Sequence, residues 1–220
     1  LAANNYAAAY PIVSYYNATN DPRISYGVLQ RTSDNTYVGQ IPGAKTMYKE
    51  WGEKDWKNAQ VSAINVNAAI SMPIYLFTQS ELQFLIAESE LRFNNDADAA
   101  KIAYEAGVNA DFASRGVSGA SSFLAGSLVN FDAQSTTADK LKLIYMQKWV
   151  ALFFRDHMEA WSEVRRTDVP ETYSGTAKDV YKGVSYPAGD MILPALNYKG
   201  NKGLCKRLPY PASVRTKNTN

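Results

Sequence analysis

The sequence predicts a mostly α-helical fold in which helical hairpins carry long irregular loops and a few short strands. Apolar residues recur at helical spacing between residues 77 and 167, and capping residues precede several of these stretches. Pro, Gly and Asn interrupt the segments on either side. With 220 residues, 46% of them hydrophobic, the chain can bury one sizeable core. We therefore expect a single domain with a loop-rich region over 1–76, a helical core over 77–167 and a loop-rich tail over 168–220.

The region 1–76 shows little helical period after a short start, so we expect structured loops with a few short extended pieces. Loops of this length are usually either functional or disordered. The chain is 12% aromatic, with 15 Tyr and 4 Trp, and this composition argues against disorder. We expect this region to lie on the ligand side of the molecule.

Residues 48–57 form an aromatic segment that is a candidate binding site, because aromatic rings alternate there with charged groups. Tyr48, Trp51 and Trp56 would stack on the apolar faces of sugar rings. Asp55 and Lys57 would form hydrogen bonds with sugar hydroxyl groups. In the alternative interpretation, Trp51 and Trp56 anchor the loop onto the helical core.

The first helix of the core is predicted to begin after Thr78. Thr78 and Glu81 form a capping box, in which each side chain accepts a hydrogen bond from the backbone N–H of the other residue. Apolar residues then fall on one stripe at i, i+3, i+4 and i+11: Leu82, Leu85, Ile86 and Phe93. The sequence predicts that this stripe faces a partner helix.

A second helix is predicted after a break at residues 94–96. Mostly small residues recur there at helical spacing: Ala99, Ile102, Ala103, Ala106 and Ala110. Small side chains let two helices approach closely, so we expect the first two helices to form an antiparallel hairpin. Such packing is tetratricopeptide-like, although no repeat of about 34 residues can be recognised. Residues 115–137 are rich in Ser, Gly and Ala, and they predict a connector with a short helix near 123–129.

A third helix, capped by Thr136 or Thr137, is predicted to be central to the core because its apolar face is wide. One row of this face comprises Leu141, Tyr145, Trp149, Leu152 and Phe153. The row beside it comprises Met146, Val150 and Phe154.

A fourth helix is predicted from the capping residue Asp156 to about Arg166, ending before Val169-Pro170. Glutamates on the first helix and paired arginines on the fourth suggest an ion pair between the two helices. We expect Glu88 to contact Arg165 or Arg166, because the planar guanidinium group can bind both oxygens of a carboxylate.

Composition and motifs exclude several classes of function. The net charge is +2, with basic and acidic residues interspersed, so no nucleic-acid surface is expected. His157 is the one histidine and no nucleotide or zinc motif is present, so we expect no metal, no cofactor and no catalytic residue, and a helix-start or surface role for His157. Cys205, the one cysteine, is expected to be a free thiol. No apolar run approaches the roughly 20 residues of a membrane-spanning helix.

Several short pieces, in order along nearly the whole chain, resemble the SusD/RagB family of outer-membrane nutrient-binding lipoproteins, specifically its SusD-like branch. These pieces are Asp21-Pro22-Arg23, Tyr37-Val38-Gly39, Pro42-Gly43, Glu81–Glu88, Tyr104–Val108, Gln147–Phe153, Glu159-Ala160-Trp161, Arg165-Arg166-Thr167 and Arg207–Pro211. No single piece is specific, and it is their combination that carries the resemblance. Binding residues vary between family members, so none is transferred to this chain.

The resemblance implies a surface-exposed outer-membrane protein, held by a lipid anchor, that binds a glycan or a peptide and is not an enzyme. It also implies delivery of the ligand to a SusC-like TonB-dependent transporter. The chain is similar to the C-terminal half of such proteins and lacks their lipidated cysteine, so we expect a missing N-terminal half as a further partner.

Two alternatives to glycan capture remain open at this point. One is a peptide-binding or protein-interaction scaffold of the RagB type. The other is a fragment of a helical glycoside hydrolase, because that reaction needs only two carboxylates at a fixed separation. The carboxylates considered for such a pair are Asp21, Asp34, Glu53 and Asp55.

Overall fold

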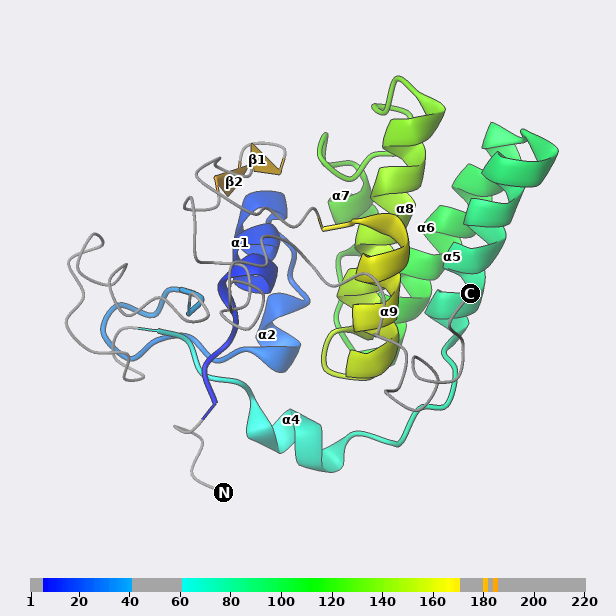
Figure 1. Ribbon diagram of the computed structural model, residues 1–220. Helices are drawn as coiled ribbons and strands as arrows, with labels where there is room; N and C mark the ends of the chain where they lie inside the picture. The colour runs from blue at the N-terminus through cyan, green and yellow to red at the C-terminus, as the bar shows by residue number, and fades with distance from the viewer. Residues whose placement is uncertain (1–5, 41–60, 171–179, 182–183, 186–220) are drawn as a thin grey trace, which may run out of the picture.

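The computed structural model describes residues 6–40, 61–170, 180–181 and 184–185, and it confirms a mostly helical fold (Figure 1). The helices are Tyr10–Thr19 (α1), Ile24–Gly27 (α2), Val66–Ser71 (α4), Gln79–Ser89 (α5), Ala97–Ser114 (α6), Ala120–Leu124 (α7), Thr137–Leu152 (α8) and His157–Thr167 (α9). A π-helical turn, η2, covers Glu90–Asn94. Val180–Tyr181 (β1) and Val184–Ser185 (β2) pair antiparallel.

The predicted hairpin of the first two core helices is formed by α5 and α6, which lie side by side (Figure 1). Both helix starts are capped, the first as expected. The Thr78 hydroxyl accepts a hydrogen bond from the Glu81 N–H at 3.1 Å, and the Asp96 side chain accepts one from the Ala99 N–H at 2.9 Å. The two helices approach closely where the ring of Phe84 lies on Gly107, because a Cβ atom on Gly107 would be 2.7 Å from the ring. This contact therefore depends on the glycine at position 107, and not on the alanines that the sequence predicted at the contact face of α6.

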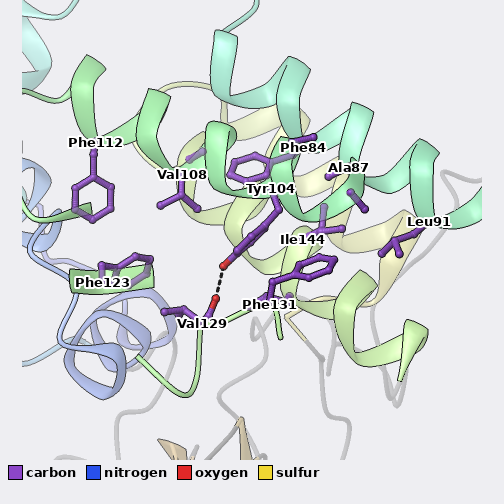
Figure 2. Close-up of a cluster of buried hydrophobic side chains, with 14 residues drawn as sticks. Phe84, Ala87, Leu91, Tyr104, Val108, Phe112, Phe123, Val129, Phe131 and Ile144 are labelled. Carbon is purple, nitrogen blue, oxygen red and sulfur yellow. Dashed lines mark hydrogen bonds between the residues drawn. The ribbon is translucent and has the colours of Figure 1, made fainter. Parts of the chain in front are cut away.

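The face of α5 that packs on the core differs from the predicted one. Leu82, Leu85, Ile86 and Phe93, which we call the outer stripe, are 39%, 38%, 37% and 78% exposed. The buried face carries Phe84 and Ala87 and is continued by Leu91 of η2; all three belong to the buried cluster in Figure 2. The prediction that the outer stripe faces a partner helix is therefore wrong within the described part of the chain. Both sets of residues have helical spacing, so the period alone could not choose between the two faces.

The same ambiguity affects α6. Ala103 is buried as predicted, but Ile102 is 71% exposed. The residues that α6 buries are Ala100, Ala103, Tyr104, Gly107, Val108, Asp111 and Phe112. The buried face of α6 therefore carries larger side chains than the mostly alanine face that the sequence predicted.

The cluster between α5, α6 and α8 is closed by the connector that follows α6. The hydroxyl group of the buried Tyr104 donates a hydrogen bond to the Val129 carbonyl at 2.7 Å (Figure 2). Phe123 of α7 lies against Phe112 with ring centroids 5.4 Å apart. The predicted short helix in this connector therefore exists, but α7 begins and ends earlier than residues 123–129.

Helix α8 is central, as predicted. Thr136 is its cap, and its side chain accepts a hydrogen bond from the Asp139 N–H at 3.1 Å. The helix contributes Leu143, Ile144 and Ala151 to the cluster beside α5 and α6, and Met146 and Val150 to a second cluster around α1. It ends at Leu152, so the predicted apolar rows extend past the helix into the turn that follows.

The region 1–76 contains more helix than its sequence indicated. Helix α1 begins with Pro11 in its first turn and buries Ile12, Val13, Tyr15 and Tyr16. Because consecutive residues are buried, α1 has no polar face and therefore no amphipathic period. This is the physical reason why the sequence predicted loops here.

We expect Gly107→Ala to lower the free energy of unfolding by about 1–3 kcal/mol, because the new methyl group would overlap the ring of the buried Phe84. This direction is opposite to the intrinsic helix propensity, which favours alanine over glycine. Urea denaturation measures the effect. Adding Phe84→Leu to Gly107→Ala should reduce the coupling between the two positions, and a stabilised Gly107→Ala protein would contradict the close contact.

Candidate functional site

The aromatic segment lies between two described stretches that are held together by backbone hydrogen bonds. Residues 6–10, 38–40 and 61–64, which we call the stem, meet at the start of α1. The Ala8 N–H donates to the Ser62 carbonyl at 2.8 Å, and the Ala8 carbonyl accepts from the Gln40 N–H at 2.7 Å. The Ser62 hydroxyl accepts from the Val38 N–H at 3.0 Å. The stem therefore fixes Gln40 and Val61, the two described residues on either side of segment 41–60.

The stem depends on a close backbone approach at Gly39. A Cβ atom on this residue would lie 2.4 Å from the Cα of Tyr10, so only glycine fits without a backbone shift. Ser62 of the stem is also buried.

The predicted ligand residues themselves lie outside the described residues, and their role stays a prediction: Tyr48, Trp51, Asp55, Trp56 and Lys57.

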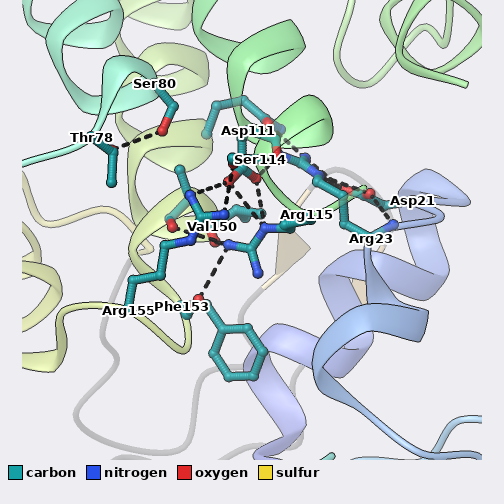
Figure 3. A network of polar contacts seen from close by, with 12 residues as sticks. Asp21, Arg23, Thr78, Ser80, Asp111, Ser114, Arg115, Val150, Phe153 and Arg155 are labelled. Carbon is teal, nitrogen blue, oxygen red and sulfur yellow. Dashed lines mark hydrogen bonds and ion pairs between the residues drawn. The ribbon is translucent and has the colours of Figure 1, made fainter. Parts of the chain in front are cut away.

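Beneath the stem, α1 and α2 are joined to the helical core through the buried guanidinium group of Arg23 (Figure 3). Arg23 donates to both carboxylate oxygens of Asp21, with the shortest contact at 2.6 Å, and to Asp111 of α6 at 2.8 Å. It also donates to the side-chain oxygen of Gln147 in α8 at 2.8 Å. These contacts bridge 88 and 124 residues of sequence, so Arg23 connects three parts of the fold.

Asp111 is shared by three arginines, which makes it the centre of the network. Besides Arg23, Arg115 contacts it at 3.0 Å and Arg155 at 3.1 Å. Arg115 also donates to the carbonyls of Val150, Ala151 and Phe153. These carbonyls lie at the C-terminal end of α8, where a positive charge is favourable because the helix dipole is negative there.

The charges in this network stabilise one another despite their burial. Burial alone would lower the pKa of Arg23, but the carboxylates of Asp21 and Asp111 raise it above its ordinary value, so Arg23 stays charged. Burial likewise raises the pKa of the nearby Tyr16 above its usual range, which keeps that side chain neutral. A buried charge of this kind requires every partner to be present.

A second network joins α5 to α9 and includes the predicted interhelical pair. Arg166 donates to the two carboxylate oxygens of Glu88 at 2.7 and 2.8 Å, and Tyr145 donates to Glu88 at 2.9 Å. Arg165, the other candidate partner, instead stacks over the ring of Trp161 at 4.1 Å. Helical geometry explains the difference, because adjacent residues on a helix point in different directions.

Of the other candidate carboxylates, Asp21 is occupied by Arg23, and Asp34 is bonded to Arg31 on the surface. Glu53 and Asp55 lie outside the described residues, as does Cys205. His157 is exposed at the first residue of α9.

In the described part of the chain, no group of three or more His, Cys, Asp or Glu side chains could hold a metal ion. Within these same ranges, every helix is too short or too polar to span a membrane.

The residues that make the central network were not identified as such from the sequence. Asp21 and Arg23 stood in a recognisable piece, but their burial could not be inferred from it. The sequence did contain one signal for buried polar residues: Asp111 and Gln147 have apolar residues at helical spacing on either side of them. Polar residues on a core face predict a buried polar network, because buried polar groups require partners.

A family profile described as starch-binding and associating with the outer membrane, of the SusD-like type, matches residues 2–187. No curated protein matches the chain.

Solved structures of SusD homologues match the fold. One from Bacteroides fragilis has a TM-score of 0.62 and 21% identity, over 87% of this chain and 45% of that chain. One from Bacteroides thetaiotaomicron has a TM-score of 0.59 and 28% identity, over 76% and 39%. A chitin-binding SusD homologue from Flavobacterium johnsoniae has a TM-score of 0.59 and 29% identity, over 76% and 38%. The chain thus spans less than half the length of each of these structures.

We expect Arg23→Met to lower the free energy of unfolding by about 3–5 kcal/mol, because it would leave Asp21 and Asp111 buried with fewer partners. Arg31→Met is the matched control. It removes an arginine–aspartate pair of similar geometry in which Asp34 is solvent-exposed, so its effect should be far smaller. Urea denaturation of the two variants tests this, and equal losses would contradict a structural role specific to Arg23.

The stability of the fold should fall as the pH decreases from about 5 to 2. Burial would raise the pKa of Glu88, but hydrogen bonds from Arg166, Arg92 and Tyr145 lower it from 4.5 to about 2. Between these values the unfolded chain binds a proton that the folded chain does not, so acid favours unfolding.

Urea midpoints measured across this pH range should therefore fall more steeply in the wild type than in Glu88→Gln. The comparison with the variant is needed because burial raises the pKa of the neighbouring Glu81, which acts in the opposite direction. Parallel profiles would show that Glu88 is not held in its charged form.

Proposed function

Since the chain belongs to the SusD-like family, we propose that it captures glycans at the cell surface, as part of a nutrient-binding outer-membrane lipoprotein. The family is associated with the outer membrane and with starch binding. One solved homologue binds chitin. We propose an oligosaccharide as the ligand of this chain.

The observation that carries the proposal is the stem, which supports both ends of the segment holding the predicted ligand residues. The stem is fixed at Gly39 and rests on α1, and the Arg23 network in turn holds α1 and α2 against the helical core. A rigid base of this kind reduces the ordering cost when a loop binds its ligand.

Binding would come from stacking combined with hydrogen bonds. Tyr48, Trp51 and Trp56 would cover the apolar faces of sugar rings, while Asp55 and Lys57 would bond to hydroxyl groups. Each hydroxyl exchanges water partners for protein partners, so the net gain from each hydrogen bond is small. The resulting modest affinity suits a protein that releases its ligand unchanged to a SusC-like TonB-dependent transporter.

We expect Trp51→Ala or Trp56→Ala to weaken binding of maltooligosaccharides or chitooligosaccharides by at least about tenfold, because one stacking surface is lost. The thermal unfolding midpoint should hardly change. Trp161→Ala is the matched control, since this tryptophan stacks on Arg165 in α9. Calorimetric titration of the three variants gives the comparison.

Loss of stability in step with loss of binding would instead support an anchoring role for Trp51 and Trp56. Binding of a peptide library without any glycan binding would favour a scaffold of the RagB type. Release of reducing sugar from a bound glycan would contradict a purely binding role.

A further inference from the structure

Helix α9, which lies against α8 in Figure 1, is attached to the described core mainly through charged groups. Its one buried residue is Glu163. Neither apolar cluster includes a residue of α9 within the described ranges, whereas α5, α6 and α8 all contribute buried side chains. Met158 of α9 is 69% exposed, and Trp161 stacks on Arg165 of the same helix. Apolar burial, which attaches most helices to a core, therefore contributes little to the docking of α9.

The contacts that hold α9 centre on Lys148 of α8. The side chain of Lys148 is 3% exposed, and its Nζ atom lies 3.1 Å from Glu159 and 3.3 Å from Glu163, both on α9. Glu81 of α5 is a third carboxylate, at 4.0 Å from Nζ. One buried cation is thus shared by three carboxylates from two helices.

Arg166 provides a second link between α9 and α5. It pairs with Glu88 of α5 at 2.7 Å and with Glu163 of its own helix at 2.8 Å. Together with the contacts of Lys148, these pairs form what we call the α9 junction. Its carboxylates are Glu81, Glu88, Glu159 and Glu163, and its cations are Lys148, Arg166 and Arg92, the last of which pairs with Glu88. Negative charge is therefore in excess.

The excess charge is felt most at Glu81, which is the carboxylate farthest from Lys148. Burial raises the pKa of Glu81 above its ordinary value; Lys148 lowers it, while Glu159 and Asp156 at the start of α9 raise it again. The charged form of Glu81 is thus unfavourable in the folded chain. The charge of Glu163 is instead bound by both Lys148 and Arg166, so it strengthens the α9 junction.

We propose that α9 is a releasable strap, a helix that an increase in ionic strength detaches from α5 and α8 while the rest of the helical core stays folded. Ion pairs return to water on release, and their hydration offsets much of the attraction that is lost. The net free energy of docking is therefore smaller than the number of contacts suggests. Release of α9 exposes the side chain of Lys148.

Salt can reach the α9 junction because two of its groups are partly exposed. The side chains of Glu159 and Arg166 are 37% and 39% exposed. The distance over which salt screens charges falls from about 30 Å at 0.01 M to about 3 Å at 1 M. The apolar contacts that join α5, α6 and α8 are not weakened by this screening.

Hydrogen exchange of the 220-residue chain at constant pH 7 tests the proposal, because the protection of each helix reports its own opening. Raising NaCl from about 0.01 M to about 1 M should lower the protection of α9 at least about fivefold, and that of α6 and α8 by less than about twofold. Unchanged protection of α9 would overturn the proposal. So would an equal loss in all three helices, because the chain would then open as a whole.

The reactivity of Lys148 toward an amine-modifying reagent gives a second measurement on the same protein. Its labelling should increase with salt in step with the loss of α9 protection. Lys101, whose side chain is 35% exposed, is the accessible control. Labelling of Lys148 that stays slow at high salt would overturn the proposal.

Two isosteric variants that face the same lysine should have opposite effects. At low salt, Glu163→Gln should lower the protection of α9 about tenfold, because Lys148 and Arg166 both lose a charged partner. Glu81→Gln should instead raise it about twofold, because the excess negative charge is removed. Glutamine can retain the contact of Glu81 with the start of α5. A loss of α9 protection in Glu81→Gln would overturn the proposal.

The control variant is Asp132→Asn, which removes an ion pair with Lys101 that does not involve α9. It should leave the protection of α9 unchanged, and a loss equal to that of Glu163→Gln would overturn the proposal. If Glu163→Gln does not fold, the salt dependence of the wild type decides. None of these measurements involves a glycan, so they remain informative if the proposed function is wrong.

Discussion

The fold depends most on the buried guanidinium group of Arg23. Its contacts with Asp21, Asp111 and Gln147 connect the segment after α1 with α6 and α8. The rings of Phe112 and Phe123 cover the guanidinium at 4.8 and 4.9 Å, so water cannot replace a missing partner. The position of α1, and therefore of the stem, follows from this set of contacts.

The charged groups of the two described networks are used for structural contacts. The networks around Asp111 and Glu88 direct their charged groups toward one another. The stem, which flanks segment 41–60, contains no charged residue and takes no part in these networks. Catalysis often relies on charged groups with an unusual pKa that face a cleft, whereas here such groups hold helices together. The charged groups of the two networks thus serve to hold the helical base together.

The sequence and the structure agree wherever local rules suffice. The caps at Thr78, Asp96, Thr136 and Asp156 are present, since a capping side chain reaches an N–H only a few residues away. The disagreement over the outer stripe has a different origin. Helix α5 has two sets of apolar residues, and which set is buried depends on where α6 and α8 lie.

The sequence by itself determined the helical class, the main helix starts and the family, because these depend on short-range spacing and on recognisable local pieces. Only the tertiary structure decided that Arg23 would bind Asp111 and Gln147, that Gly107 would receive Phe84, and that five consecutive residues of α1, Ile12–Tyr16, would be buried. These contacts join residues far apart in the chain. Their energies come from desolvation and packing, which depend on partners that no local pattern specifies.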